Sequence, residues 1–536
     1  MKNFLFISFF ISTLIGNAQI FTQNPTSGSI IITPKGVGSS SYSSSVTTNV
    51  VFGEDAMKYN TTGNWNTAIG RATLTSNRTG VGNTAVGNGS LALNYSGDNN
   101  VAVGGEALYS NTTGMYNTAI GDRSLHENIS GSNNVAFGAT ALYYNTGNAN
   151  TAIGTQSLYS NTTGNENTAI GNEALKFNTT GNWNTAIGRK ALYSNTMGSQ
   201  NTAVGNGALE LNTGSSNTAV GEQALAFNTS GEGNTGIGWN ALFKNSTGTF
   251  NTATGANALN NNTTGQQNTA NGFFALRNNL TGGNNTANGF FALRNNLTGN
   301  GNIANGSFAL NNNTIGIYNT ANGYATLLNN TTGSNNTANG HLAGIAIVEG
   351  NSNTFLGDSA DATGDFSNVV AIGASAKVSA SNKVRIGNES ITVIEGQVAW
   401  SNPSDRRLKE NIIYSNQLGL DFINRLQTVS YNYIADKTQT RYDGFIAQDV
   451  EQIMKDLNVP FSGVKKSNDG TYSLAYSDFV MPLVNAVKEQ QNQINDLKKE
   501  NEALKKGNEV LEALVKRVTA LEESKLQPKL QNSERE

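Results

Sequence analysis

A serine and a lysine that lie five positions apart are the residues of this chain best suited to chemistry. Ser404 and Lys409 flank the run Asp-Arg-Arg-Leu. A serine–lysine pair can act as nucleophile and base if the lysine is neutral and takes the hydroxyl proton. On a continuous α-helix this spacing turns through ~500° and leaves the two side chains ~140° apart. The two side chains can therefore meet only if Ser404 precedes the helix, in an extended or turn conformation, and Lys409 reaches back.

The lysine of such a pair has to lose its charge. A lysine in water has a pKa of ~10.4, so a lysine base must be desolvated or crowded by other cations. Arg406 and Arg407 could supply that crowding. The structural alternative is that Ser404 caps a basic helix start, as serine does at many helix N-termini. The residues alone favour the capping role, because the motif is short.

Three motifs in order resemble a known family. Residues 404–412 (SDRRLKENI) resemble the opening of the endosialidase-type intramolecular chaperone domain, which ends phage tail spikes, tail fibres and some cellular proteins. Residues 444–451 (GFIAQDVE) and 476–487 (YSDFVMPLVNAV) resemble its later motifs, so the resemblance covers about the last quarter of the chain. It implies a domain that trimerises, helps an upstream β-rich fibre to fold and then cuts itself off as a serine peptidase. It also implies that Ser404 and Lys409 form the dyad and that the Pro403–Ser404 bond is cut.

Composition limits the other functions. Only 13% of the 536 residues are charged and the net charge is -3, which gives no support for a nucleic-acid partner. Cysteine is absent, so disulfides and thiolate metal sites are excluded. The two histidines, His126 and His341, both lie in the repeat region described below, so a histidine metal site or a histidine-dependent triad is not expected. The sequence therefore predicts no cofactor and no metal.

The N-terminus predicts export. Residues 1–18 read as a signal peptide, with Lys2 as the charge, a short apolar run and small residues before Gln19. That run is too short to span a bilayer comfortably, and no other such run occurs, so we expect a secreted or cell-surface protein without an integral membrane segment. Residues 19–48 are rich in Ser, Thr and Gly and are expected to form a flexible or extended lead-in.

Residues 49–396 carry an internal repeat. The unit is roughly NTAIGxxALxxNTTGxx, and its glycine recurs every seventeen residues, occasionally sixteen, from Gly70 to Gly357. A fixed period of this size predicts a solenoid whose coils must stack, because one unit cannot bury its own apolar side chains. About twenty coils at a strand spacing of ~4.8 Å would form a rod ~95 Å long. The Asn, Thr and Gly residues suit turns.

The unit also resembles the YadA-like head repeat of trimeric autotransporter adhesins, although that family's usual repeat is shorter. The resemblance implies a left-handed β-roll and a trimer of rolls packed side by side. From Asn271 onward an asparagine replaces the usual Ile or Val of the strand, through Asn288, Asn305, Asn322 and Asn339. Stacked in register, these side chains would form a hydrogen-bonded ladder. Lining a trimer axis, they would bind water or ions; the ladder is favoured because it needs no further assumption.

The remaining segments predict a small domain and a helix. Residues 397–403 form a connector. Apolar spacing within residues 404–481 predicts two helices, around Phe422 and Val450, a strand near Tyr431 and a hairpin at residues 468–470, which is an α+β domain. Residues 482–523 fit heptads with Ile494 at position a and Leu497 at position d, which predicts a coiled coil. The pattern leaves two or three strands open, and the chaperone resemblance favours three. Residues 524–536 are expected to be a tail.

The function predicted from these features is an exported homotrimeric fibre or adhesin-like surface protein. Its rod presents a surface to an unknown ligand, a glycan or a protein, and its C-terminal domain aligns the chains and self-cleaves before Ser404. The main rival is an uncleaved structural or adhesive stalk in which that domain is a permanent trimerisation module. An ice-binding threonine rank is less favoured, since β-solenoids often carry such ladders for structural reasons. A carbohydrate-active solenoid is also less favoured, since no pair of carboxylates recurs along the rod.

Overall fold

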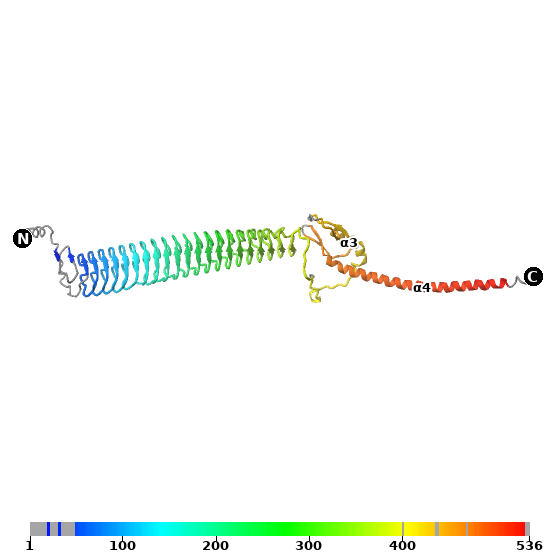
Figure 1. Ribbon diagram of the computed structural model, residues 1–536, viewed down its shortest axis with the longest axis horizontal. Coiled ribbons are helices and arrows are strands. Elements are labelled where there is room, and N and C mark those ends of the chain that lie inside the picture. The colour runs from blue at the N-terminus through cyan, green and yellow to red at the C-terminus, as the bar shows by residue number, and fades with distance from the viewer. Residues whose placement is uncertain are drawn as a thin grey trace, which may run out of the picture. The chain divides into compact units, whose positions relative to one another are not determined.

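The computed structural model describes residues 19–21, 31–33, 49–398, 401–434, 439–467 and 470–530. Residues 1–18, predicted as the signal peptide, and most of the predicted lead-in lie outside these ranges. The chain divides into two compact units, Met1–Asn388 and Glu389–Glu536. The first unit is a single column of stacked strands (Figure 1), which confirms the predicted β-solenoid and shows that its strands pair in parallel.

Each coil of the solenoid contributes one three-residue strand that pairs in parallel with the next coil. The pairing keeps equivalent residues opposite each other, as in Thr168↔Thr185 and Ala169↔Ala186. Before the column, β1 (Gln19–Phe21) pairs antiparallel with β2 (Ile31–Thr33), which is parallel to β3. The strands of the column are β3 (Val50–Phe52), β4 (Thr67–Ile69), β5 (Thr84–Val86), β6 (Val101–Val103), β7 (Thr118–Ile120), β8 (Val135–Phe137), β9 (Thr151–Ile153), β10 (Thr168–Ile170), β11 (Thr185–Ile187), β12 (Thr202–Val204), β13 (Thr218–Val220), β14 (Thr235–Ile237), β15 (Thr252–Thr254), β16 (Thr269–Asn271), β17 (Thr286–Asn288), β18 (Ile303–Asn305), β19 (Thr320–Asn322), β20 (Thr337–Asn339), β21 (Thr354–Leu356), β23 (Val370–Ile372) and β25 (Val384–Ile386), with β22 (Asp361–Ala362) paired to β24 (Lys377–Val378) beside it.

The core of the solenoid is a narrow column of small and branched side chains. We number each coil from the asparagine that precedes its strand, so that Asn66 is position 1 and Trp65 is position 17 of the coil before it. Alanine at position 3, such as Ala68, and leucine at position 9, such as Leu74, are fully buried. Glycine at position 5 has a left-handed backbone, and a Cβ on Gly70 would lie 2.3 Å from the carbonyl oxygen of Gly87. Only glycine lets successive coils approach this closely.

Two buried asparagine ladders, which sequence reasoning assigned to turns, run through the inside of the solenoid. At position 1, Asn83 Oδ1 accepts hydrogen bonds from the backbone N–H (3.0 Å) and the Nδ2 (3.1 Å) of Asn100. At position 12, Asn94 Nδ2 donates to Asn77 Oδ1 at 2.8 Å. These side chains are fully buried, and they satisfy backbone groups that the tight turns leave unpaired.

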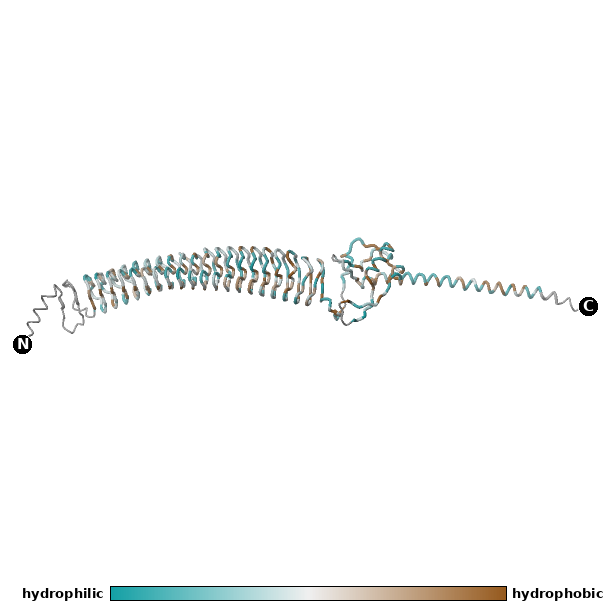
Figure 2. The backbone as a smooth tube through the Cα atoms, turned by 90° about the horizontal axis from the view of Figure 1, so that it is seen from above, coloured by the Kyte–Doolittle hydropathy of each residue, from teal (hydrophilic) through white to brown (hydrophobic). Residues whose placement is uncertain are grey.

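The outer face carries the ladder that the sequence predicts. Asn271 Nδ2 donates to Asn288 Oδ1 at 2.8 Å, Asn288 to Asn305 at 2.8 Å, and Asn305 to Asn322 at 2.9 Å. Asn339 stands in register opposite Asn322 on the next strand. Each coil of the column contains both hydrophilic and hydrophobic residues (Figure 2).

The second unit is small and mixed. It contains η1 (Arg406–Leu408), α2 (Leu420–Arg425), β26 (Val429–Tyr431), β27 (Tyr442–Gly444), α3 (Ala447–Leu457), β28 (Val464–Lys466), β29 (Tyr472–Leu474), η2 (Tyr476–Phe479) and α4 (Val480–Leu530). β26 pairs antiparallel with β27, and β28 with β29, which confirms the predicted hairpin although residues 468 and 469 of its turn lie outside the described residues. Phe422, Val450, Phe461 and Phe479 form the core.

The helix α4 is one continuous element of 51 residues, labelled in Figure 1. It continues to Leu530, beyond residue 524, where the sequence predicts a tail. Its first turns bind the small domain: the Glu489 Oε2 accepts from the backbone N–H of Leu420 at 2.8 Å, and Asn485 Nδ2 donates to the carbonyl of Leu418 at 3.3 Å. Within the described residues, no helix combines the length and apolarity needed to cross a bilayer.

Candidate functional site: a serine–lysine pair

A one-turn helix brings Ser404 and Lys409 together. Residues 401–405 are irregular, η1 covers Arg406–Leu408, and Lys409 follows it in an extended conformation with φ -124° and ψ 136°. The backbone N–H of Lys409 donates to the carbonyl of Arg406 at 3.1 Å, which closes the turn. Because the helix ends after three residues, Lys409 lies outside it and its side chain can reach Ser404. A longer α-helix would hold the two side chains on different faces.

The two reactive groups are in hydrogen-bond contact. Lys409 Nζ donates to Ser404 Oγ at 2.7 Å. This is the arrangement that the spacing requires, with the serine before the helix and the lysine reaching back. A nucleophile and a base within about 2.6–3.2 Å of each other have the geometry for proton transfer from the hydroxyl.

Asp405, rather than Ser404, caps the helix. Its Oδ1 accepts from the backbone N–H of Arg407 at 2.8 Å, so the capping role that the sequence offered for the serine belongs to its neighbour. The Oδ2 of Asp405 also lies 2.6 Å from Arg407 Nη2. The hydrogen bonds from the Arg407 side chain and backbone hold the pKa of the Asp405 carboxyl below its ordinary value. Asp405 therefore balances the charge of Arg407, and crowding by that arginine does not explain how the lysine would become neutral.

The pair is open to solvent in the single chain. Ser404, Lys409 and the residues around them are all exposed. The other two motifs lie instead at the core of the domain: the Tyr476 hydroxyl accepts from the backbone N–H of Phe445 at 2.9 Å, and the rings of Phe445 and Phe479 stack 5.2 Å apart. The first motif thus carries the reactive groups, and the later two build the body that holds it.

Residues 404–458 match a known family model. That family is described as the chaperone of endosialidase, within the peptidase S74 group. The match begins at Ser404 and contains the first two motifs, whereas the third, residues 476–487, lies beyond it. Comparison of the whole chain with curated proteins gave no match.

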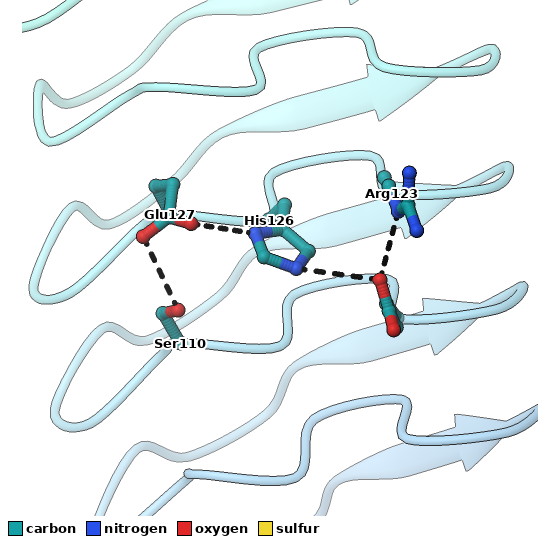
Figure 3. A network of polar contacts seen from close by, with 5 residues as sticks. Ser110, Arg123, His126 and Glu127 are labelled. Carbon is teal, nitrogen blue, oxygen red and sulfur yellow. Dashed lines mark hydrogen bonds and ion pairs between the residues drawn. The ribbon is translucent and has the colours of Figure 1, made fainter.

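The two histidines take part in contacts between coils. His126 is sandwiched between Tyr109 and Tyr143, with ring centroids 5.2 and 4.9 Å away. Its Nδ1 lies 2.8 Å from Glu127 Oε1 and its Nε2 lies 3.6 Å from Glu106 Oε2 (Figure 3). His341 Nδ1 lies 2.9 Å from Asp358. Among the described residues no cluster of three or more His, Asp or Glu side chains is placed to bind a metal ion.

Proposed function

We propose that this chain forms an exported trimeric fibre whose C-terminal domain assembles three solenoids and then releases itself by cutting the Pro403–Ser404 bond. The observation that carries the proposal is the 2.7 Å contact between Lys409 Nζ and Ser404 Oγ at the start of the segment that matches the chaperone family. The match supports the chaperone role, and the contact supports the dyad.

The proposed cut needs only groups of this chain and water. Neutral Lys409 takes the proton of the Ser404 hydroxyl as Oγ attacks the carbonyl carbon of Pro403. The peptide C–N bond breaks, the released nitrogen takes the proton from Lys409, and Pro403 is left as an ester on Oγ. Water then hydrolyses the ester, which gives a rod ending in a Pro403 carboxylate and a domain beginning with Ser404. The reaction occurs once in each chain.

Unpaired apolar side chains support the trimer. On α4, Ile494, Leu497, Leu504 and Leu511 are 46 to 63% exposed in the single chain, at the spacing of heptad positions a and d. The outward face of the solenoid strands carries a similar stripe at position 4, which includes Ile69, Ile153, Ile187 and Ile237, each more than a third exposed. Apolar stripes of this length are typical of surfaces that bind another chain. Burial between chains would also remove the exposed dyad from water, as a neutral lysine requires.

The size of the mature chain tests the cut. Wild-type protein is expected to give two fragments on denaturing electrophoresis, with the smaller one starting at Ser404 on N-terminal sequencing. Ser404→Ala removes the nucleophile at little change in volume and should leave an intact chain. Lys409→Met should do the same. Lys409→Arg should also fail, because a guanidinium is not deprotonated in proteins.

Each variant has to be shown by light scattering to form the same trimer as wild type, so that loss of cutting is not loss of folding. A wild-type trimer that stays intact after prolonged incubation would contradict self-cleavage and favour the permanent stalk. A monomeric full-length chain at micromolar concentration would contradict the trimer itself.

A further inference from the structure

Five aromatic side chains form a regular row along one edge of the solenoid. Position 17 directly precedes the buried position-1 asparagine. It is aromatic at intervals of four coils, except for the interval of three coils between Trp65 and Tyr116. The members of this aromatic row are Trp65, Tyr116, Trp183, Phe250 and Tyr318, and they are 56 to 69% exposed. Four coils at a strand spacing of ~4.8 Å separate neighbouring rings by ~19 Å along the rod.

The row lies outside the buried core of the solenoid. All five residues have a left-handed backbone, with φ between 55° and 58°. The stacking of coils imposes that conformation, since the backbone N–H of Phe250 donates to the carbonyl of Glu232 in the coil before, at 3.0 Å. In the other coils position 17 is mostly Gly, Asn, Ser or Gln. A bulky aromatic residue is strained in this conformation, and it contributes nothing to the buried core at this position.

The rings lie along the rod and over the preceding coil. A Cβ on Gly233 would lie 2.8 Å from the Phe250 ring, and a Cβ on Gly301 would lie 2.6 Å from the Tyr318 ring. Trp183 points in the same direction, because its Nε1 donates to Glu166 Oε2 at 3.0 Å. Glycine below two of the rings leaves room for the ring to sit against the backbone, where it forms a platform.

The surroundings of the row are mainly polar, with three carboxylates, Asp98, Glu166 and Glu232, and no cation at positions 16 and 17 of these coils. Glu166 is the one charged residue at position 17 in these coils. The neighbouring position 16 is mostly an amide or a hydroxyl. The side chains of Asn148, Asn165 and Asn182 each accept a hydrogen bond from the position-16 backbone N–H of the preceding coil. An exposed ring face beside neutral amides and hydroxyls suits a sugar ring, whose C–H face packs on the electron-rich aromatic face while its hydroxyls bind the polar rim.

We propose that the aromatic row binds a linear, uncharged polysaccharide of β-linked, all-equatorial sugars, such as a β-1,4-linked chain of glucose or N-acetylglucosamine, laid along the rod. One exposed ring would hold a free sugar weakly. Several rings lie in line on a stiff rod, so once a polymer binds one ring, its binding to the next ring is intramolecular. The affinity for the polymer therefore rises with its length. The inference rests on the proposed role of the rod as the ligand-presenting part of the fibre, but it does not depend on cleavage.

The test is binding of the full-length chain to microcrystalline cellulose and to chitin powder. The triple variant Trp183→Asn, Phe250→Asn, Tyr318→Asn should bind at least tenfold less protein than wild type. Asparagine occurs at position 17 in other coils and tolerates a left-handed backbone, so this variant should fold and melt at the same temperature or higher. The matched control removes one Tyr, one Phe and one Trp of similar exposure elsewhere on the solenoid, by Tyr95→Asn, Phe227→Asn and Trp239→Asn, and should bind as wild type.

Three outcomes would overturn the proposal: wild type binds neither polymer, the row variant binds as well as wild type, or the row variant alone changes the trimer mass in light scattering. The last would assign the rings to contacts between chains. Binding should also persist in 0.5 M salt, because the ligand is uncharged; loss of binding in salt would contradict a neutral ligand. Repeating the assay on Ser404→Ala separates the two proposals, since this uncut variant should bind as wild type. A wild-type chain that stays uncut but still binds would refute only the cleavage.

Discussion

Ser404 and Lys409 meet because η1 is only three residues long. Asp405 starts this turn by capping the N–H of Arg407, and the extended backbone of Lys409 ends it. The spacing of five predicted this geometry, since the pair could not meet on one continuous helix. The sequence did not reveal that Asp405 is the cap, because serine and aspartate are equally good N-caps and the two are adjacent.

Pro403 should slow the cut. Its ring fixes the φ angle of the residue whose carbonyl is attacked. This restricts the directions from which Ser404 Oγ can reach the carbonyl carbon. We expect Pro403→Ala to cleave faster than wild type, measured as the loss of intact chain with time after refolding. Asn402→Ala is a suitable control, since it changes the neighbouring position without altering the backbone restriction. Equal rates for Pro403→Ala and wild type would show that the ring does not limit the reaction.

At the scale of the element, asparagine has two different roles in the solenoid. Asn288 lies on the outer face, and its side chain forms hydrogen bonds with the equivalent side chains of Asn271 and Asn305. Asn134 lies inside, where its Oδ1 accepts from the N–H of Asn150 at 3.0 Å and its Nδ2 donates to the carbonyl of Gly147 at 2.9 Å. Removal of the inner side chain leaves backbone groups buried without partners, at a cost of about 1–3 kcal/mol each.

Asn134→Leu should therefore destabilise the solenoid by about 3 kcal/mol or more, as two or more buried partners are lost. Asn288→Ile restores the residue type of the upstream coils on an outer face and should change stability by less than about 1 kcal/mol. Thermal unfolding and protease resistance of the two variants give the comparison. Similar losses for both would mean that the inner ladder adds nothing beyond the outer one.

The period predicted the solenoid and the asparagine ladder on its outer face, because a repeat of seventeen fixes which residues stack. It did not predict the inner ladders, since asparagine also suits left-handed turns. The signal that could have separated the roles is constancy within the chain: positions 1 and 12 are asparagine in nearly every coil, whereas the turn positions 13, 16 and 17 vary. Nothing in the sequence predicted the left-handed backbone of buried leucines such as Leu74 and Leu91. The stacked coils impose this conformation, which leucine otherwise rarely adopts.

At the scale of the whole molecule, the solenoid repeats too regularly to align the three chains of the proposed trimer by itself. Along the outer strand face, a trimer shifted by one coil would still place Ile or Val opposite Ile or Val over β4–β14, except at Phe137 of β8, and asparagine opposite asparagine over most of β16–β20. Only Phe137 and the coils at the borders of these blocks would be mismatched, so the slip would cost little free energy. A distinct domain at one end, joined to a long helix with exposed apolar residues, can fix the register before the coils form.

The rod should consequently need its C-terminal region to fold, but not the cut. Residues 19–403 expressed alone are expected to give aggregates or trimers of mixed register, which proteases trim to ragged fragments. The full chain carrying Ser404→Ala keeps the domain and loses only the nucleophile, so it should give uniform, protease-resistant trimers. Light scattering and limited proteolysis distinguish the two preparations. If the rod alone forms soluble, resistant trimers as readily as the full chain, register is encoded in the coils themselves and the C-terminal domain is not a chaperone for them.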